Sequence, residues 1–203
     1  MRKYIAFEGL DLSGKTTIIN NIKLKRSEYI YTKEPGGFNN DLSLKIRDLI
    51  LNYKDEIDPI VETYLFAASR AIDMKETKKY LEDDKVVISD RSYYTSMFYQ
   101  GVLKRLGLST VKDINKYALN GIEPDIIFYI TVDEKDRLKR IKNRKTLNRL
   151  DEETLAIDYF KNNLLYLEML KNMSAANIYV INTSKYDMDI IVNKIINIIE
   201  KEQ

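Results

Sequence analysis

The stretch Glu8-Gly-Leu-Asp-Leu-Ser-Gly-Lys-Thr-Thr-Ile18 decides the fold class of this chain of 203 residues. Its two glycines, its lysine and its first threonine have the spacing G-x-x-x-x-G-K-[ST], which is typical of a loop that binds phosphate groups. Glycine lets successive N–H groups turn toward one anion, and the dipole of a following helix adds to the attraction. An apolar run, Tyr4–Glu8, precedes the loop, and isoleucines at helical spacing follow it. The stretch therefore predicts a nucleoside triphosphate site between a strand and a helix.

Every residue of this loop is a candidate for binding the triphosphate. In such a loop Lys15 reaches the β- and γ-phosphates, and the Thr16 hydroxyl ligates Mg²⁺. Asp11 is unexpected because a carboxylate repels phosphate, and we expect Lys15 and the metal to offset its charge. The candidates are Gly9, Leu10, Asp11, Leu12, Ser13, Gly14, Lys15, Thr16 and Thr17.

The composition limits the chemistry that this site can use. The chain has no cysteine and no histidine, which excludes disulfides, thiolate metal sites and the commonest general base. With 33 basic and 31 acidic side chains the formal net charge is +2, so neither nucleic acid nor an anionic membrane is expected as a partner. Neither a signal peptide nor a long apolar run is evident, so we expect a cytoplasmic protein.

Strand-like and helix-like segments alternate along the chain. We expect strands at Tyr4–Glu8, Tyr29–Thr32, Val86–Ser89, Asp125–Val132 and Asn177–Ile181. Their apolar runs are continuous, which indicates a parallel sheet covered on both faces. Helices are expected after the loop, from Asp58-Pro59 to about Glu82, and from Asp187 to about Lys201. This order predicts a single doubly wound α/β domain over residues 1–203.

The phosphate loop is one of four motifs that follow one another along the chain. They are Phe7-Glu-Gly-Leu-Asp-Leu-Ser-Gly-Lys-Thr-Thr17, Thr32-Lys-Glu-Pro-Gly-Gly37, Asp90-Arg91 with Thr95-Ser96 and Tyr99-Gln100-Gly101, and Pro124-Asp125. In this order and spacing they resemble the thymidylate kinase family, in its bacterial form, over nearly the whole chain. The resemblance implies a three-layer α/β fold of the P-loop NTPase type, with a five-stranded parallel sheet flanked by helices. It also implies Mg²⁺-dependent phosphoryl transfer from ATP to dTMP, giving dTDP and ADP, by a homodimer.

Asp90 and Arg91 end one of the apolar strands. A carboxylate there can hold Mg²⁺, directly or through water, and an arginine can bind a phosphate through two parallel hydrogen bonds. A structural ion pair is the alternative. The resemblance places Arg91 on the phosphate of the acceptor, although Ser92 follows where the family usually has Tyr or His. Arg47 alone would be an ordinary surface arginine, and the resemblance makes it a second ligand of that phosphate.

Two helical segments carry candidates for binding the acceptor base. Phe66 and Arg70 share one helix face, which suits a pocket wall better than a dry core. The resemblance implies that Phe66 stacks on thymine and that Arg70 binds a base carbonyl or a nearby group. The second segment is either an ordinary amphipathic helix or a source of hydroxyl and amide groups for a pyrimidine edge. Its candidates are Thr95, Ser96, Gln100 and Tyr99, the last lying where the family crowds the ribose 2′ position.

The turn Glu34-Pro-Gly-Gly37 is either a plain turn or, by resemblance, a contact to the sugar and phosphate of the acceptor. Lys33 replaces the arginine that the family usually has before the glutamate. In a kinase with two substrates Asp11 would face the gap between donor and acceptor, so we expect it to belong to the same site. The predicted dTMP site is therefore Asp11, Glu34, Pro35, Arg47, Phe66, Arg70, Arg91, Thr95, Ser96, Tyr99 and Gln100.

The segment Arg137–Arg149 is rich in lysine and arginine and contains no acid. It is either a solvated helix face or a lid, at about residues 137–150, whose arginines neutralise charge on the transferred phosphoryl group. One branch of the family has an arginine at the position of Leu12, so the lid should supply the missing cation. The predicted catalytic residues are Asp11, Lys15, Arg91, Arg140, Arg144 and Arg149, and the predicted Mg²⁺ ligands are Thr16 and Asp90.

Three other functions stay open at this point. The nearest is another P-loop kinase, for a deoxynucleoside or a different nucleoside monophosphate, but a nucleoside has no phosphate to occupy Arg47, Arg70 and Arg91. A regulatory ATPase or switch would hydrolyse ATP without an acceptor. Nucleic-acid binding through the basic segment disagrees with the net charge of +2. Asn182 and Thr183, after the last strand, are candidates by position for contact with adenine.

Overall fold

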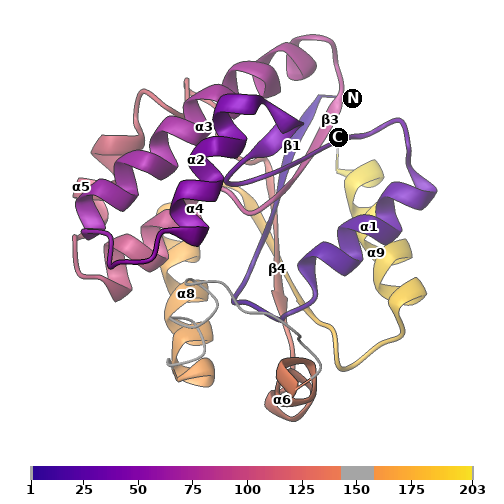
Figure 1. The fold of residues 1–203 in the computed structure, drawn as a ribbon. Helices are drawn as coiled ribbons and strands as arrows, with labels where there is room; N and C mark the ends of the chain where they lie inside the picture. Colours follow the sequence, from indigo (N-terminus) through magenta and orange to yellow (C-terminus); the bar gives the residue numbers. More distant parts are fainter. Residues whose placement is uncertain (1, 143–157, 203) are drawn as a thin grey trace.

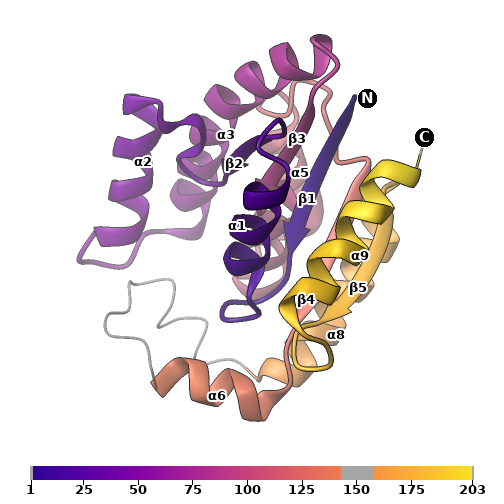
Figure 2. The ribbon, with the colours of Figure 1, turned by 90° about the vertical axis from the view of Figure 1, so that its right-hand side faces the viewer.

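The computed structural model describes residues 2–142 and 158–202. Its centre is one sheet of five parallel strands (Figures 1 and 2), and their order in the sheet is β2-β3-β1-β4-β5. The predicted fold class is therefore confirmed. The strands are β1 Lys3–Glu8, β2 Ile30–Lys33, β3 Val86–Asp90, β4 Ile126–Thr131 and β5 Asn177–Asn182.

Helices cover both faces of this sheet, as Figures 1 and 2 show. On one face lie α1 (Lys15–Lys25) and α9 (Met188–Lys201). On the other lie α3 (Pro59–Glu82), α4 (Tyr93–Ser96), α5 (Leu108–Asn115) and α8 (Tyr159–Met173). The remaining helices are α2 (Asp41–Asn52), which packs on α3, and α6 (Glu134–Lys142), with a 3-10 turn η1 (Gly37–Asn39) and a π-helix η2 (Met97–Leu103).

Strand β1 shows why the apolar runs are continuous. Successive side chains of a strand point to opposite faces, so both faces must be apolar when helices cover both. Ile5 and Phe7 pack with the isoleucines of α1 and α9, whereas Ala6 lies in the cluster that α4 and α8 cover. All six residues of β1 are buried, and the last of them is a charged residue, Glu8.

The helix boundaries follow the expected signals, with one exception. Asp58 caps α3 by accepting a hydrogen bond from the Ile60 N–H (2.8 Å), and Pro59 occupies the first turn. The exception is the segment that follows β3, where α4 gives way to the π-helix η2. The Lys104 N–H donates to the Tyr99 carbonyl, five residues back. The apolar spacing that predicts an α-helix does not distinguish this pattern, which is common at functional sites.

The carboxyl ends of β1, β2 and β3 lie at one edge of the sheet. In the register of the strands, Phe7 and Lys33 both pair with Asp90. The chain fills the sheet on one side of β1 before it crosses to β4 on the other side. Such a reversal of direction creates a crevice at the carboxyl edge, where ligands of open α/β sheets bind. Within the described ranges, no helix is both long and apolar enough to span a membrane.

Replacing Leu170 by alanine should lower the free energy of unfolding by about 2–5 kcal/mol, because it removes a side chain from a packed core. Leu170 of α8 is 0% exposed in the cluster between α4, α8 and the sheet. Leu24→Ala is the matched control, since Leu24 is 84% exposed and should change stability by less than about 0.5 kcal/mol. Urea unfolding of both variants measures the difference, and equal losses would contradict this packing of α8.

Candidate active site

A cavity of about 730 Å³ lies at this carboxyl edge and joins the phosphate loop to the segments that follow β2 and β3. The phosphate loop, α2, α3, α4 and η2 contribute its walls, with α6 and the segment after β5 at one end. The predicted residues that line it are Asp11, Leu12, Gly14, Lys15, Thr16, Thr17, Glu34, Pro35, Arg47, Phe66, Arg70, Asp90, Arg91, Thr95, Ser96, Tyr99, Gln100, Arg140 and Thr183. Residues predicted for two different substrates therefore share one space.

Of the residues that the structure describes, three predicted for the phosphate loop do not line this cavity, and neither does Asn182, the last residue of β5. Leu10 is 0% exposed and lies in the hydrophobic core. Ser13 is also fully buried, and Gly9 contributes its carbonyl oxygen to the hydrogen bonds of the site. Arg144 and Arg149 lie outside the described residues.

The backbone conformation of the phosphate loop requires a residue without a side chain at position 9. Its φ is +134°, and a Cβ there would collide with the backbone oxygen of Ile130 on β4. Helix α1 begins at Lys15 without a side-chain cap among the described residues. Its first N–H groups are therefore available to an anion, and the helix dipole favours a negative charge at this end.

Lys15 lies under the loop with its ammonium group turned toward backbone oxygens. Lys15 Nζ donates to the carbonyl oxygens of Gly9 (2.9 Å) and Leu10 (3.1 Å), and the residue is 6% exposed. Burial lowers the pKa of Lys15 to about 8, with a further contribution from Arg91 that Asp11 opposes. A bound phosphate would favour the charged form, because it replaces lost solvation with an anion.

Thr16 and Asp90 form the part of the site that suits a magnesium ion. Thr16 Oγ1 donates to Asp90 Oδ2 over 2.6 Å, which brings a hydroxyl and a carboxylate together beside the loop. No group of three or more His, Cys, Asp or Glu that could hold a metal occurs in the described part of the chain. Magnesium commonly binds through one or two protein oxygens together with water and substrate phosphates, so these two residues fit that ion.

Arg91 provides the positive charge beside Asp11. Arg91 Nη2 forms an ion pair with Asp11 Oδ1, while Nη1 donates to the Gly9 carbonyl (3.3 Å) and Thr95 Oγ1 (3.4 Å). The φ of Arg91 is 77°, a left-handed conformation that is strained for a residue with a side chain. Its N–H donates to the Phe7 carbonyl (3.0 Å), and this contact ties the strained residue to β1. Lys15 and the metal were expected to offset the charge of Asp11; Lys15 does interact with it electrostatically, and Arg91 adds a direct ion pair that the sequence did not predict.

Glu8 is a residue of the site to which the sequence assigned no role. It is 0% exposed, and its carboxylate accepts hydrogen bonds from Ser92 N (2.8 Å) and Ser92 Oγ (2.7 Å). It also accepts from Thr95 Oγ1 (2.7 Å) and from the hydroxyl of Tyr166 on α8 (2.6 Å). Four donors compensate for the loss of water around this carboxylate. The sequence did offer one signal for this residue, because Glu8 is an acid at the end of a strand predicted to be buried on both faces.

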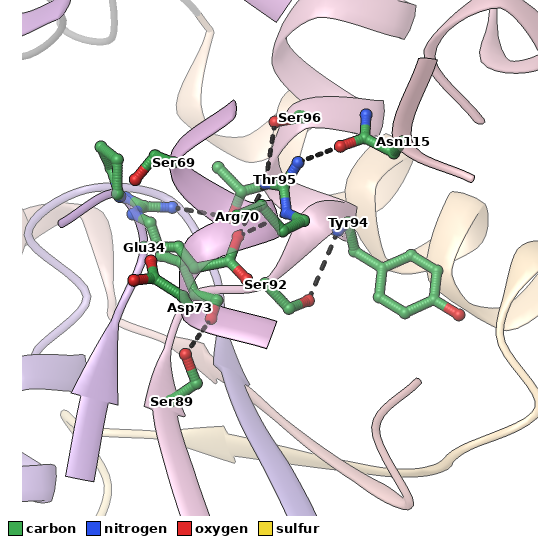
Figure 3. Close-up of polar contacts among 12 residues, drawn as sticks. Glu34, Ser69, Arg70, Asp73, Ser89, Ser92, Tyr94, Thr95, Ser96 and Asn115 are labelled. Atoms are coloured by element: carbon green, nitrogen blue, oxygen red, sulfur yellow. Dashed lines mark hydrogen bonds and ion pairs between the residues drawn. The ribbon is translucent and has the colours of Figure 1, made fainter. Parts of the chain in front are cut away.

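Arg70 is held by contacts from three other segments, and it lies in the middle of these contacts in Figure 3. Its Nε and Nη2 both lie 2.7 Å from Glu34 Oε2, and both side chains are almost fully buried. Nη2 also donates to Ser96 Oγ (3.2 Å), and Nη1 donates to Asn115 Oδ1. Burial raises the pKa of Glu34, and the Arg70 guanidinium opposes that rise. Asn115 was not identified from the sequence because it lies on α5, outside the motifs.

The turn after Glu34 rests on a polar network from α2 and α3. The N–H groups of Gly36 and Gly37 donate to Ser69 Oγ (3.1 Å) and Asp73 Oδ2 (3.2 Å). Ser43 of α2 bonds to both of these side chains. Arg47, one helical turn further along α2, donates from Nη1 to the carbonyl of Pro35 (2.6 Å). A Cβ on Gly36, whose φ is +88°, would lie 2.7 Å from Arg47 Cδ, so glycine permits this approach.

The end of α6 reaches the phosphate loop. Arg140 Nη1 donates to the carbonyl of Leu12 (2.8 Å), and Nη2 donates to Thr183 Oγ1 (3.2 Å). Thr183 in turn donates to the Ser13 carbonyl (2.9 Å). A guanidinium therefore lies beside the uncharged Leu12. Thr183, a candidate for contact with adenine, lies against the phosphate loop.

The fold and the site together define a P-loop phosphotransferase, with a phosphate loop and a second binding region in one cavity. A model of the thymidylate kinase family matches residues 7–195. The chain is 37% identical over 203 residues to the thymidylate kinase of Mycoplasmoides gallisepticum, covering 97% of this chain and 93% of that protein. It is 35% identical over 206 residues to that of Ligilactobacillus salivarius, covering 97% of each. The chain belongs to the thymidylate kinase family.

A solved structure supports the same fold. The crystal structure of thymidylate kinase from Ehrlichia chaffeensis is similar with a TM-score of 0.74 and 24% sequence identity, covering 98% of both chains. The two chains therefore share the same fold over nearly their whole length.

Asp73 should make the stability of the protein depend on pH. Burial raises its pKa to about 7, and Glu34 contributes further. Between about pH 4 and pH 7 the folded protein then holds a proton that the unfolded chain has lost, so the free energy of unfolding falls as pH rises through this range. Asp73→Asn stays neutral, and its stability relative to the wild type should increase by about 2–4 kcal/mol from pH 4 to pH 7.

Urea unfolding at several pH values measures this dependence. Asp48→Asn is the control, because Asp48 is an exposed acid on the neighbouring helix α2. A constant stability difference between Asp73→Asn and the wild type across this pH range would show that Asp73 is ionised throughout.

Proposed function

We propose that this chain transfers the γ-phosphoryl group of ATP to dTMP, giving dTDP and ADP, as a step of dTTP biosynthesis. One observation carries the proposal. A single cavity holds a phosphate loop at one end, and the rest of its lining includes three arginines, Arg47, Arg70 and Arg91, and a buried aromatic ring. Such a cavity suits two substrates that both carry phosphate, one of which also carries a base. The named relatives support thymine as that base.

The donor end is organised to hold a triphosphate and to balance its charge. The loop N–H groups and Lys15 would bind the phosphates, and Thr16 and Asp90 would hold Mg²⁺. When bound, Mg²⁺ neutralises charge on the β- and γ-phosphate oxygens. Phosphoryl transfer requires mainly positioning and charge stabilisation from the protein, which agrees with a site built of Lys, Arg and carboxylates.

The acceptor end would hold dTMP between α2, α3 and the segment after β3. Arg91 and Arg47 both line the cavity and would bind the monophosphate, with Asp11 beside Arg91 to orient the acceptor oxygen. Phe66 is 7% exposed and offers a ring for stacking in the cavity wall. Stacking of a base on an aromatic side chain is worth roughly 1–3 kcal/mol. Tyr99, Ser96 and Thr95 complete the wall beside Arg91.

The basic segment is proposed as a lid in the same single domain. The contact of Arg140 with Leu12 supports a role for this segment beside the donor phosphates. Arg144 and Arg149 are assigned to the lid from the sequence alone. The homodimer and the cytoplasmic location also stay predictions from the sequence and the resemblance.

A coupled assay of ADP release with a panel of acceptors tests the proposed reaction. With ATP and Mg²⁺, dTMP should be phosphorylated faster than dUMP, dCMP, dGMP and thymidine. Thymidine should be inactive because it offers no phosphate to Arg47 and Arg91. Turnover of thymidine without turnover of dTMP would identify a nucleoside kinase, and ATP hydrolysis that no acceptor stimulates would identify an ATPase.

Arg140→Ala should lower kcat by about 10²-fold with a smaller change in the KM for dTMP, because its guanidinium lies on the donor side of the cavity. Lys139→Ala is the control, since the neighbouring Lys139 is exposed and pairs with Asp136. Steady-state kinetics with varied dTMP separate the two parameters. A rise in the KM for dTMP at unchanged kcat would show that Arg140 takes no part in the chemical step.

A further inference from the structure

A buried carboxylate lies behind the wall of the acceptor cavity and contacts one of the residues that line it. Glu62, in the first turn of α3, is 0% exposed. Its Oε2 accepts hydrogen bonds from Gln100 Nε2 (2.7 Å) and from Lys104 Nζ (2.9 Å). Gln100 lines the cavity, whereas Glu62 and Lys104 do not.

These contacts dictate which way the Gln100 amide points. An ionised carboxylate can only accept hydrogen bonds, and the ammonium group of Lys104 stabilises the ionised form. The NH₂ group of Gln100 must therefore face Glu62, and the amide oxygen must face away from it. In the described part of the chain, Gln100 Oε1 is buried without a hydrogen-bond partner, although the residue is only 2% exposed. A buried acceptor without a partner is costly unless a ligand supplies the donor.

Helix α3 places this acceptor beside an aromatic ring and a hydrogen-bond donor. Glu62, Phe66 and Arg70 follow one another at intervals of four and therefore lie along one face of α3. Of the five N–H groups of Arg70, one on Nε, one on Nη1 and two on Nη2 are used by Glu34, Asn115 and Ser96. The remaining Nη1 hydrogen is a donor in the same cavity wall that holds Gln100.

We propose that Glu62 is a positioning residue that fixes the Gln100 amide with its oxygen toward the cavity, so that the site selects an acceptor base with a ring N–H group. The inference deepens the proposed function and rests on it. A ring N–H next to a carbonyl group, as in thymine and uracil, offers a donor for Gln100 Oε1 and an acceptor for Arg70. Cytosine has an unprotonated ring nitrogen at the same place and an amino group beside it, so both hydrogen bonds become repulsive contacts.

The carboxylate matters because a glutamine amide can otherwise rotate to suit either base. A rotated Gln100 would present Nε2 to the ring nitrogen of cytosine, but it would also turn Oε1 toward Glu62. Two acceptors would then face each other in a buried site, which is unfavourable. Glu62→Gln removes this restriction, because the new amide can donate to Gln100 Oε1 as well as accept from Nε2.

The test compares kcat/KM for dTMP and for dCMP in the wild type and in Glu62→Gln. We expect the dTMP/dCMP ratio to fall at least about tenfold, with kcat/KM for dCMP unchanged or higher. General damage to the cavity would instead lower both values together. Glu76→Gln is the matched control, because it changes the same side chain on the same helix at an exposed ion pair with Lys79, and it should leave the ratio unchanged.

Gln100→Leu keeps the test decisive if Glu62→Gln fails to fold. This variant retains Glu62 and Lys104 but removes the amide, so the dTMP/dCMP ratio should again fall at least about tenfold. An unchanged ratio in either variant, or an equal loss for both substrates, would overturn the inference. A wild-type enzyme that does not phosphorylate dTMP would instead overturn the proposed function, so the two failures are distinguishable.

Discussion

The arrangement of the site depends on the hydrogen bonds that the buried Glu8 carboxylate accepts. This carboxylate lies at the carboxyl end of β1 and accepts hydrogen bonds from Ser92, Thr95 and Tyr166. These three residues come from the segment after β3 and from α8, so one buried charge connects the central strand with two other elements. Removing any one donor would leave a charge that is 0% exposed with less compensation. Arg91, directly before Ser92, is joined to the same strand by the hydrogen bond from its N–H to the Phe7 carbonyl.

The basic side chains that line the cavity outnumber its carboxylates, although two of the arginines are already paired within the protein. Arg91 pairs with Asp11, Arg70 pairs with Glu34, and the Thr16 hydroxyl donates to Asp90. An incoming phosphate must therefore compete with Asp11 for Arg91, whereas the Lys15 ammonium exchanges backbone carbonyls for phosphate oxygens. For Lys15 the exchange replaces neutral partners with a charged one and so strengthens the hydrogen bonds to the donor phosphates. For Arg91 it replaces one anion with another, and the excess of basic side chains in the lining favours a phosphate there.

Those parts of the fold and the site that follow from local chemistry could be predicted from the sequence. The loop spacing, the Asp58-Pro59 start of α3 and the continuous apolar strands each have a local cause, and the structure contains all three. The partners of the buried polar side chains could not be predicted, because they depend on tertiary contacts. Asn115 meets Arg70 across 45 positions of the chain, and Tyr166 meets Glu8 across 158. The π-helix η2 could not be predicted from the sequence either, because the spacing of apolar residues does not determine its hydrogen-bond pattern.

A common principle connects the buried residues that the sequence did not identify. Glu8, Asn115, Asp73 and Glu62 do not line the cavity within the described chain, yet each holds a group that does so or that supports its wall. Thr95, Arg70, the Gly36-Gly37 turn and Gln100 are held in this way, each by a hydrogen bond that it donates to a side chain outside its own segment. Side chains that are already oriented lose little freedom when a ligand binds, so more of their interaction energy appears as affinity and specificity. The donor end differs, because its guanidinium comes from Arg140 at the end of α6, a helix that contributes a single residue to the cavity wall. The acceptor site is therefore organised by the core of the protein, whereas part of the charge on the donor side comes from a helix outside the sheet layers.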